Sequence, residues 1–325
     1  MNKTKLVLGV DVGGTNTVFG LVDKTGNVFL IDSIPTHGDK SAEDLFKRLF
    51  EKFYQVSEDA KEDFELAGIG IGAPNANYYK GTVENPPNLN WEYVDIISLI
   101  KKFSDAPVAL TNDANAAALG EMYYGAAKGM KDLIVITLGT GLGSGIVVNG
   151  NLVYGHDGFA GEIGHTIYDP QGRQCGCGRK GCLETYASAP GIKRTVMELI
   201  ANTNFKSKLR SVSYESLDAK FITELALQGD KIALEAFDFT AKVLGIKLAD
   251  AIAHTSPEAI ILFGGLANAG DLLLVPTKKY LEENVFHVFR NKVKILKSEL
   301  NEGKSAVLGA AALIWHELNT MVINQ

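Results

Sequence analysis

The three cysteines of the chain, Cys175, Cys177 and Cys182, lie within one stretch of eight residues that is rich in glycine. Three thiolates at this spacing can occupy three corners of a tetrahedron around zinc, with Zn–S bonds of about 2.3 Å. Two histidines lie close enough in sequence to supply the fourth ligand, His165 and His156, and we favour His165. Unrelated buried thiols would instead be scattered along the chain. A closed site with four protein ligands is structural, so the pattern predicts a structural zinc ion.

Two glycine-threonine loops are candidates for binding phosphate: Asp11-Val12-Gly13-Gly14-Thr15 and Gly139-Thr140-Gly141-Leu142-Gly143. Glycine allows successive backbone N–H groups to converge on phosphate oxygens, and a threonine hydroxyl adds a donor. Asp11 ends the first apolar run, where its carboxylate can hold the Mg²⁺ that accompanies ATP, although a hairpin-turn aspartate is the plainer alternative. The predicted nucleotide contacts are Asp11, Gly13, Gly14, Thr15, Gly139, Thr140 and Gly141.

A third glycine pair, Gly264-Gly265, follows the apolar segment Ala259–Phe263, which we expect to be a buried strand. Glycine lets a ligand come close to the backbone. We therefore predict that this pair lies on the adenine side of the nucleotide.

The acid-base candidate is Asp113, in the sequence Asn112-Asp113-Ala114-Asn115. It follows a predicted strand and begins an alanine-rich helix, which is where open α/β sheets place ligand contacts. A helix N-cap is the alternative, since Asp and Asn are preferred there. Phosphoryl transfer to an alcohol needs a carboxylate that accepts the hydroxyl proton, and we predict that Asp113 has this role.

Acidic and imidazole side chains flank the cysteines: Glu162 and His165 precede them and Glu184 follows. Carboxylates can accept hydrogen bonds from several hydroxyl groups at once, as recognition of a sugar requires. The sequence therefore predicts a sugar site braced by the zinc loop.

The elements that must position these residues occur twice. Three short apolar runs at 6–12, 17–22 and 28–34 are separated by a Gly-Thr loop and a hairpin turn, and similar runs recur at 133–138, 144–148 and 152–154. Tight glycine and asparagine turns between such runs predict antiparallel strands. We therefore expect two related α/β domains, the first made of residues 1–117 and 305–325 and the second of residues 118–304.

Composition narrows the functional class. The chain has 325 residues and a net charge of −6, and no Lys/Arg cluster of a nucleic-acid-binding protein is present. We find neither a signal-peptide core nor an apolar run of the roughly 20 residues that span a bilayer. These features predict a cytoplasmic protein that binds neither nucleic acid nor membrane, in a compartment where clustered cysteines favour metal over disulfides.

These motifs together resemble the ROK family of bacterial sugar kinases and regulators. The resemblance rests on Asp11-x-Gly-Gly-Thr15, Asn112-Asp113-x-Asn115, Glu162-x-Gly-His165 and the cysteine motif that ends in Glu184, and it covers nearly the whole chain. It implies an actin-like (ribonuclease H-like) ATPase fold, with two α/β domains and a nucleotide and sugar cleft between them. It also implies a homodimer or homotetramer.

Carried to the matching positions, the resemblance implies that Asp113 is the catalytic base. It also implies that His165 binds zinc through one ring nitrogen and a sugar hydroxyl through the other, and that Thr15 and Thr140 bind phosphates. The implied sugar contacts are Asn88, Asn112, Asp113, Glu162, His165 and Glu184. The sequence departs from many members at Ala73-Pro74-Asn75, in a loop that approaches the sugar.

The leading hypothesis is an ATP- and Mg²⁺-dependent glucokinase. A kinase for N-acetylglucosamine, N-acetylmannosamine, mannose or fructose is the first alternative, because one sugar substituent often changes binding by only about 1–3 kcal/mol. A sugar-sensing repressor is the second, and we disfavour it because the first strand is expected by about Leu6, which leaves no room for a helix-turn-helix domain. The sequence leaves open whether another donor, such as polyphosphate, replaces ATP.

Overall fold

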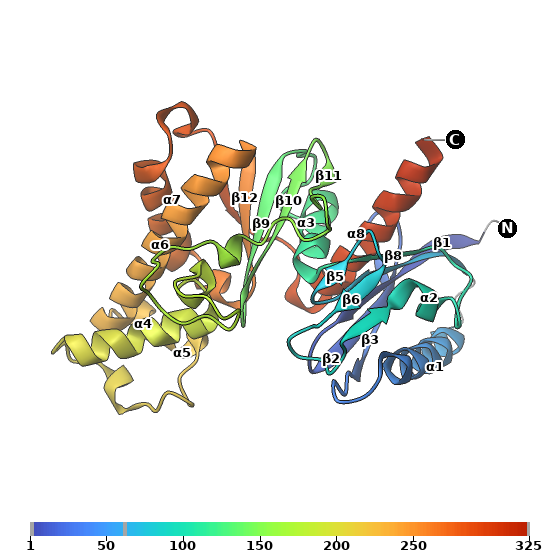
Figure 1. Cartoon of the computed structure of the whole chain (residues 1–325), viewed down its shortest axis with the longest axis horizontal. Coiled ribbons are helices and arrows are strands. Elements are labelled where there is room, and N and C mark those ends of the chain that lie inside the picture. Colours follow the sequence, from blue (N-terminus) through green and yellow to red (C-terminus); the bar gives the residue numbers. More distant parts are fainter. Residues whose placement is uncertain (1–2, 61–63, 324–325) are drawn as a thin grey trace. The chain divides into compact units, whose positions relative to one another are not determined.

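The computed structural model describes residues 3–60 and 64–323, which form two compact units (Figure 1). Unit 1 comprises Met1–Gly129, Leu152–Ala160 and Glu299–Gln325. Unit 2 comprises Met130–Asn151 and Gly161–Ser298.

Unit 1 is built on a five-stranded sheet in the order β3-β2-β1-β4-β8. Strands β1 and β2 are antiparallel, as are β2 and β3, whereas β1, β4 and β8 run parallel. The parallel strands therefore end at the same edge of the sheet. The bounds are Thr4–Val12 for β1, Asn16–Val22 for β2, Val28–Pro35 for β3, Phe64–Gly72 for β4 and Val108–Thr111 for β8.

Helices cover both faces of this sheet. Leu6, Leu8 and Val10 point to one face, where they join a core that includes the phenylalanines of α1 (Ala42–Ala60). The opposite face packs against α8 (Glu302–Ile323) and α3 (Asp113–Tyr124). The alternation of side chains along β1 thus builds two apolar layers from one strand.

Unit 1 also contains a small sheet that the sequence does not predict. It consists of β5 (Ala76–Asn77), β6 (Thr82–Glu84) and β7 (Tyr93–Asp95), and the short helix α2 (Ile96–Ile100) follows it. The apolar residues from Val94 to Phe103 alone predict one helix, and that prediction is wrong, because residues 93–95 form a strand and the helix covers only residues 96–100. The side chain of Asp95 accepts a hydrogen bond from the Ser98 N–H, and this cap starts the helix after the strand.

Unit 2 repeats the design of unit 1 in its own sheet, which has the order β11-β10-β9-β12-β13. Strands β9 and β10 are antiparallel, and β9, β12 and β13 are parallel. The same alternation of strand directions in both units confirms the predicted α/β class and its duplication. The bounds are Leu133–Leu138 for β9, Leu142–Val148 for β10, Asn151–Leu152 for β11, Ala259–Phe263 for β12 and Lys294–Lys297 for β13.

Four helices complete unit 2. Ile134, Ile136 and Leu138 of β9 share an apolar cluster with the buried residues of the long helix α6. Pro276 alone predicts a helix that begins after it, at Thr277, but α7 begins at Asp271 and contains the proline. Buried residues on both sides of Pro276, Leu273 and Leu281, hold the helix against the core. Among the described residues, no helix combines the length and apolar character needed to cross a bilayer. The bounds are Ala189–Asn202 for α4, Ala219–Leu227 for α5, Lys231–Thr255 for α6 and Asp271–Asn284 for α7.

The observed units differ in their bounds from the predicted domains. The predicted boundary at residue 117 falls inside α3, which belongs wholly to unit 1 because it packs against α8. The segment 152–160 also returns to unit 1, and the final crossing lies near residue 299 instead of 305. Local sequence patterns mark elements, but the packing of distant elements sets these boundaries.

Candidate functional site

The predicted metal ligands come together in unit 2. One ligand atom from each of His165, Cys175, Cys177 and Cys182 lies within 4.8 Å of all the others. Cys175 Sγ is 3.9 Å from His165 Nδ1, and Cys177 Sγ is 3.6 Å from Cys182 Sγ. Of the two candidate histidines, His165 is the one whose ring joins the cluster.

These distances fit zinc. Ligands about 2.3 Å from a tetrahedral metal lie roughly 3.8 Å from one another, close to the observed separations. A disulfide would require sulfur atoms about 2.05 Å apart, so Cys177 and Cys182 are not bonded. The donor set of one imidazole and three thiols is one that zinc prefers.

Glu184 connects the cysteine loop with the second glycine-threonine loop. Its Oε1 lies 3.8 Å from Cys175 Sγ, and its Oε2 accepts a hydrogen bond of 3.0 Å from the Leu142 N–H. The start of the loop is also held, because the Ala189 N–H donates to Gly139 O at 2.9 Å. The predicted sugar acid and the predicted phosphate loop are therefore mechanically linked within unit 2.

Gly141 is required for this link. A Cβ at residue 141 would lie 2.5 Å from Glu184 Oε2, closer than any normal contact. We therefore expect Gly141→Ala to displace the Glu184 carboxylate and raise KM for both substrates by about tenfold, the effect of losing roughly one charged hydrogen bond. Steady-state kinetics measure this, with Gly303→Ala as a control, because a Cβ at this position outside the predicted site would meet only Asn301 Oδ1 at 3.4 Å. Equal KM values for Gly141→Ala and wild type would contradict the assignment.

The glycine pair at 264–265 lies beside this loop at the carboxyl edge of the unit 2 sheet. Phe263 of β12 pairs with Thr137 of β9, so both strands end side by side. Gly264 has a φ of +97°, and a Cβ there would lie 2.8 Å from Leu138 O, so it serves close strand packing. A Cβ at Gly265 would meet nothing within 4 Å. Gly265 is thus the member of the pair with open space for a ligand.

In unit 1, the carboxyl edge of the sheet carries the two candidate carboxylates. Gly72, the last residue of β4, pairs with Asp11 on one side and with Thr111 on the other. A Cβ at Gly72 would lie 3.5 Å from Asp11 Oδ1 and 3.7 Å from Asp113 Cα. Asp11 and Asp113 therefore flank the same glycine.

Asn112, and not Asp113, is the N-cap of α3. The Asn112 side chain accepts from the Ala114 N–H at 2.7 Å and caps α3. Asp113 Oδ1 accepts from the same N–H at 2.8 Å; the residue keeps solvent-accessible surface, although the protein atoms packed around its carboxyl group partly desolvate it. Asp113 thus keeps a carboxylate oxygen available to a substrate.

Both carboxyl groups hold their protons more tightly than ordinary aspartates. Burial, and secondarily repulsion from Asp113, raises the pKa of Asp11 from 3.8 to about 7. Desolvation also raises the pKa of Asp113, and backbone hydrogen bonds to its carboxylate oppose the shift. A base with raised proton affinity and a second acid suited to a cation are what phosphoryl transfer uses.

The raised pKa of Asp11 predicts a pH-dependent stability. Because the folded pKa of about 7 exceeds the unfolded value of 3.8, this group's contribution is complete below pH 3.8 and is lost as the pH rises through 7. We expect Asp11→Asn, which removes the charge, to raise the Tm at pH 8 without Mg²⁺ by roughly 2–8 °C, and by much less at pH 4.5. Thermal scans at both pH values measure this; a gap that does not grow with pH would contradict it.

The first glycine-threonine loop is a closed turn in unit 1. The Gly13 N–H donates to Asn16 O at 3.1 Å, so Gly13 shapes the turn. Asn88 packs against the loop, since a Cβ at Gly14 would lie 2.7 Å from Asn88 Cβ. The predicted sugar contact Asn88 and the predicted phosphate loop are therefore neighbours.

The departure from the family pattern has a local structural reason. Asn75 adopts a positive φ of 52°, which asparagine tolerates better than most residues. Its side-chain amide donates to Glu84 O at 3.2 Å and to Asn85 O at 2.9 Å. Asn75 thus lies in the turn that precedes β5, and its side chain ties this turn to the end of β6.

The predicted site residues divide between the two units. Unit 1 contains the base candidate and the first phosphate loop, and unit 2 contains the zinc cluster, two sugar acids and the second loop. Sequence reasoning missed Gly72 between the carboxylates and the Leu142 N–H that holds Glu184. The unit 1 residues are Asp11, Gly13, Gly14, Thr15, Asn88, Asn112 and Asp113, and the unit 2 residues are Gly139, Thr140, Gly141, Glu162, His165, Cys175, Cys177, Cys182, Glu184, Gly264 and Gly265.

Comparison with known proteins gives consistent matches. The model of the family described as ROK matches residues 7–317. A glucokinase of Thermotoga maritima is 34% identical over 322 residues, covering 97% of this chain and 98% of that protein. A crystal structure of a ROK family glucokinase from Streptomyces griseus, in complex with glucose and AMPPNP, is 34% identical with a TM-score of 0.77 and covers 95% of this chain and 98% of that chain. A xylose repressor of Caldicellulosiruptor bescii is 30% identical, covering 95% of this chain and 77% of that protein.

Proposed function

Because this chain belongs to the ROK family, we propose that it is an ATP-dependent hexose kinase that converts glucose to glucose 6-phosphate. The observation that carries this proposal is the exposed carboxylate of Asp113 at the sheet edge beside Asp11, with its pKa raised. Curated relatives of nearly full length are glucokinases, and a similar structure holds glucose with an ATP analogue.

Asp113 acts as the general base in this reaction. Its carboxylate accepts the proton of the glucose 6-hydroxyl as that oxygen bonds to the γ-phosphorus and the bond from phosphorus to the ADP oxygen breaks. Thr15 and Thr140, with the glycines around them, hold the phosphates. Mg²⁺, when bound near Asp11, neutralises the charge on the phosphate oxygens.

The zinc cluster braces the sugar contacts. With Nδ1 directed to the cysteines, His165 has its other ring nitrogen available for a sugar hydroxyl. The Glu184 carboxylate is fixed by the Leu142 N–H and can still accept from hydroxyl groups, since each of its oxygens has two lone pairs. Glu162, Asn88 and Asn112 supply further sugar contacts.

A panel of hexoses tests the proposed substrate. We expect kcat/KM to be highest for glucose among glucose, mannose, fructose, N-acetylglucosamine and N-acetylmannosamine, measured through ADP release with Mg-ATP. One substituent changes discrimination by about 10- to 200-fold, which the assay resolves easily. A higher kcat/KM for another hexose would move the proposal to that sugar while keeping the kinase mechanism.

A sugar-sensing regulator is the second candidate, because a xylose repressor is 30% identical to the chain. Identity to the T. maritima glucokinase is higher, at 34%, which favours the kinase. We place the enzyme in the cytoplasm, where ATP is available, as a homodimer or homotetramer. Specific DNA binding at physiological salt, without kinase turnover, would favour the regulator.

A further inference from the structure

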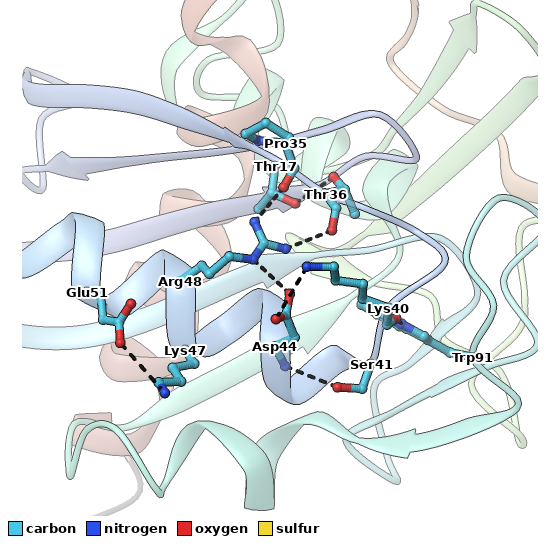
Figure 2. A network of polar contacts seen from close by, with 10 residues as sticks. All are labelled: Thr17, Pro35, Thr36, Lys40, Ser41, Asp44, Lys47, Arg48, Glu51 and Trp91. Carbon is cyan, nitrogen blue, oxygen red and sulfur yellow. Dashed lines mark hydrogen bonds and ion pairs between the residues drawn. The ribbon is translucent and has the colours of Figure 1, made fainter.

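The segment 35–40, which joins β3 to α1, is held by the polar network drawn in Figure 2. Arg48 on α1 donates to Pro35 O at 2.8 Å, to Thr36 O at 3.1 Å and to Asp44 Oδ2 at 2.8 Å. The planar guanidinium makes the three contacts from three different nitrogens, a spread of donors that the single ammonium nitrogen of lysine cannot reproduce. Arg48 therefore fixes the backbone position of Thr36.

Thr36 holds the first glycine-threonine loop in turn. Its N–H donates to Thr15 O at 2.9 Å, and its hydroxyl donates to Gly13 O at 2.7 Å. Thr17 Oγ1 lies 2.9 Å from Thr36 Oγ1, and both side chains are buried. Because the single hydroxyl hydrogen of Thr36 goes to Gly13, the Thr17 hydroxyl must donate to Thr36. One residue thus secures two carbonyl groups of the loop.

We propose that Thr36 is a positioning residue for phosphoryl transfer. It holds the loop in the shape that presents the Thr15 hydroxyl, and the N–H groups other than that of Gly13, to the ATP phosphates. The proposal rests on the proposed kinase function. Loss of the Thr36 hydroxyl leaves Gly13 O without this donor and Thr17 without this acceptor in a buried place, which favours other loop conformations.

The chain next to the predicted sugar contact Asn88 is held by hydrogen bonds that do not involve Thr36. The Asn90 N–H donates to Gly38 O at 2.6 Å, and Trp91 Nε1 donates to Lys40 O at 2.9 Å. Neither contact uses the Thr36 side chain. Asn88 packs against Gly14, but these two hydrogen bonds hold its chain independently of the loop. Removing the Thr36 hydroxyl should therefore weaken nucleotide binding much more than sugar binding. Arg48, which holds the whole segment 35–40, should affect both substrates.

Two substitutions of Thr36 test the proposal. Thr36→Val keeps the shape of the side chain and removes the hydroxyl, whereas Thr36→Ser keeps the hydroxyl. We expect Thr36→Val to raise KM for ATP, and Kd for Mg-AMPPNP by calorimetry, about 5- to 50-fold, with KM for glucose changed less than about twofold. Thr36→Ser should return KM for ATP to within about threefold of wild type, since it restores the same donor.

Thr195→Val is the matched control. Thr195 is also buried, donates to Gly191 O at 3.1 Å and accepts from Arg173 at 2.9 Å, but it lies on α4 in unit 2. It should lower the Tm by a similar amount and leave KM for ATP unchanged. A loss of nucleotide affinity equal to that of Thr36→Val would overturn the proposal, as would failure of Thr36→Ser to restore it.

Arg48→Met provides an independent arm if Thr36→Val does not fold. We expect it to raise KM for ATP and for glucose together, and an unchanged KM for ATP would overturn the proposal. The calorimetric arm separates this inference from the kinase function itself. If wild type binds Mg-AMPPNP without turning over any hexose, the function fails, while weaker AMPPNP binding by Thr36→Val still supports the role of Thr36.

Discussion

Asp113→Asn is expected to lower kcat by about 10²- to 10⁴-fold, the usual contribution of a general base. The amide keeps the size and hydrogen-bonding capacity of the side chain but cannot accept the hydroxyl proton. Glucose affinity should stay within about tenfold of wild type, because the loss falls on the transition state and not on substrate binding. Rapid-quench or coupled kinetics with direct binding of glucose measure both quantities.

Asp105→Asn is a suitable control for that experiment, since it makes the same chemical change ahead of β8 in a residue outside the proposed site. It should keep wild-type kcat. Substantial residual turnover by Asp113→Asn, at the level of this control, would refute the assignment of the base.

Loss of the zinc cluster is expected to have the second largest effect. Cys182→Ala removes one of four ligands whose atoms gather within 4.8 Å, and a structural zinc ion supplies folding free energy to the loop that it closes. Glucose Kd should rise at least about tenfold, because the cluster orients His165 and contacts Glu184, and contacts that orient residues at a metal site typically contribute about 10- to 100-fold. Mg-AMPPNP binding should change less. Elemental analysis should find one zinc per wild-type chain and much less in the variant.

Lys180→Ala controls for changes in the same loop, because this exposed residue is not among the four ligands. It should retain zinc and glucose affinity. Unchanged glucose affinity after verified zinc loss would separate the cluster from the sugar contacts and contradict the idea that zinc braces them.

The cysteine cluster could be predicted because its spacing is local. Three of the four ligands lie within eight residues, so short loops alone bring them near one another. The duplicated strands could be predicted for the same reason, since each hairpin joins strands that are neighbours in sequence. The structure confirms both sets of strands. The roles of the site residues stay predictions that the substitutions above test.

The missed features depend on register between distant segments. Gly72 separates the two carboxylates only because β4 pairs with both β1 and β8. Thr36 reaches Gly13 only because β2 and β3 align residues 16 and 35, which places the chain after β3 over the loop. No local pattern marks either residue. The predicted domain boundary at residue 117 lies inside α3 for the same reason. Helix α3 belongs to unit 1 because it packs against α8, which lies almost 200 residues away in sequence.

The proposed reaction is transfer of the γ-phosphoryl group of ATP to the 6-hydroxyl of glucose, with Asp113 as base. Phosphorus NMR of a reaction with glucose and Mg-ATP tests it most directly. We expect equal amounts of glucose 6-phosphate and ADP with wild type and only trace product with Asp113→Asn. Phosphate at another position of the sugar, or release of inorganic phosphate and ADP without any sugar phosphate, would contradict it.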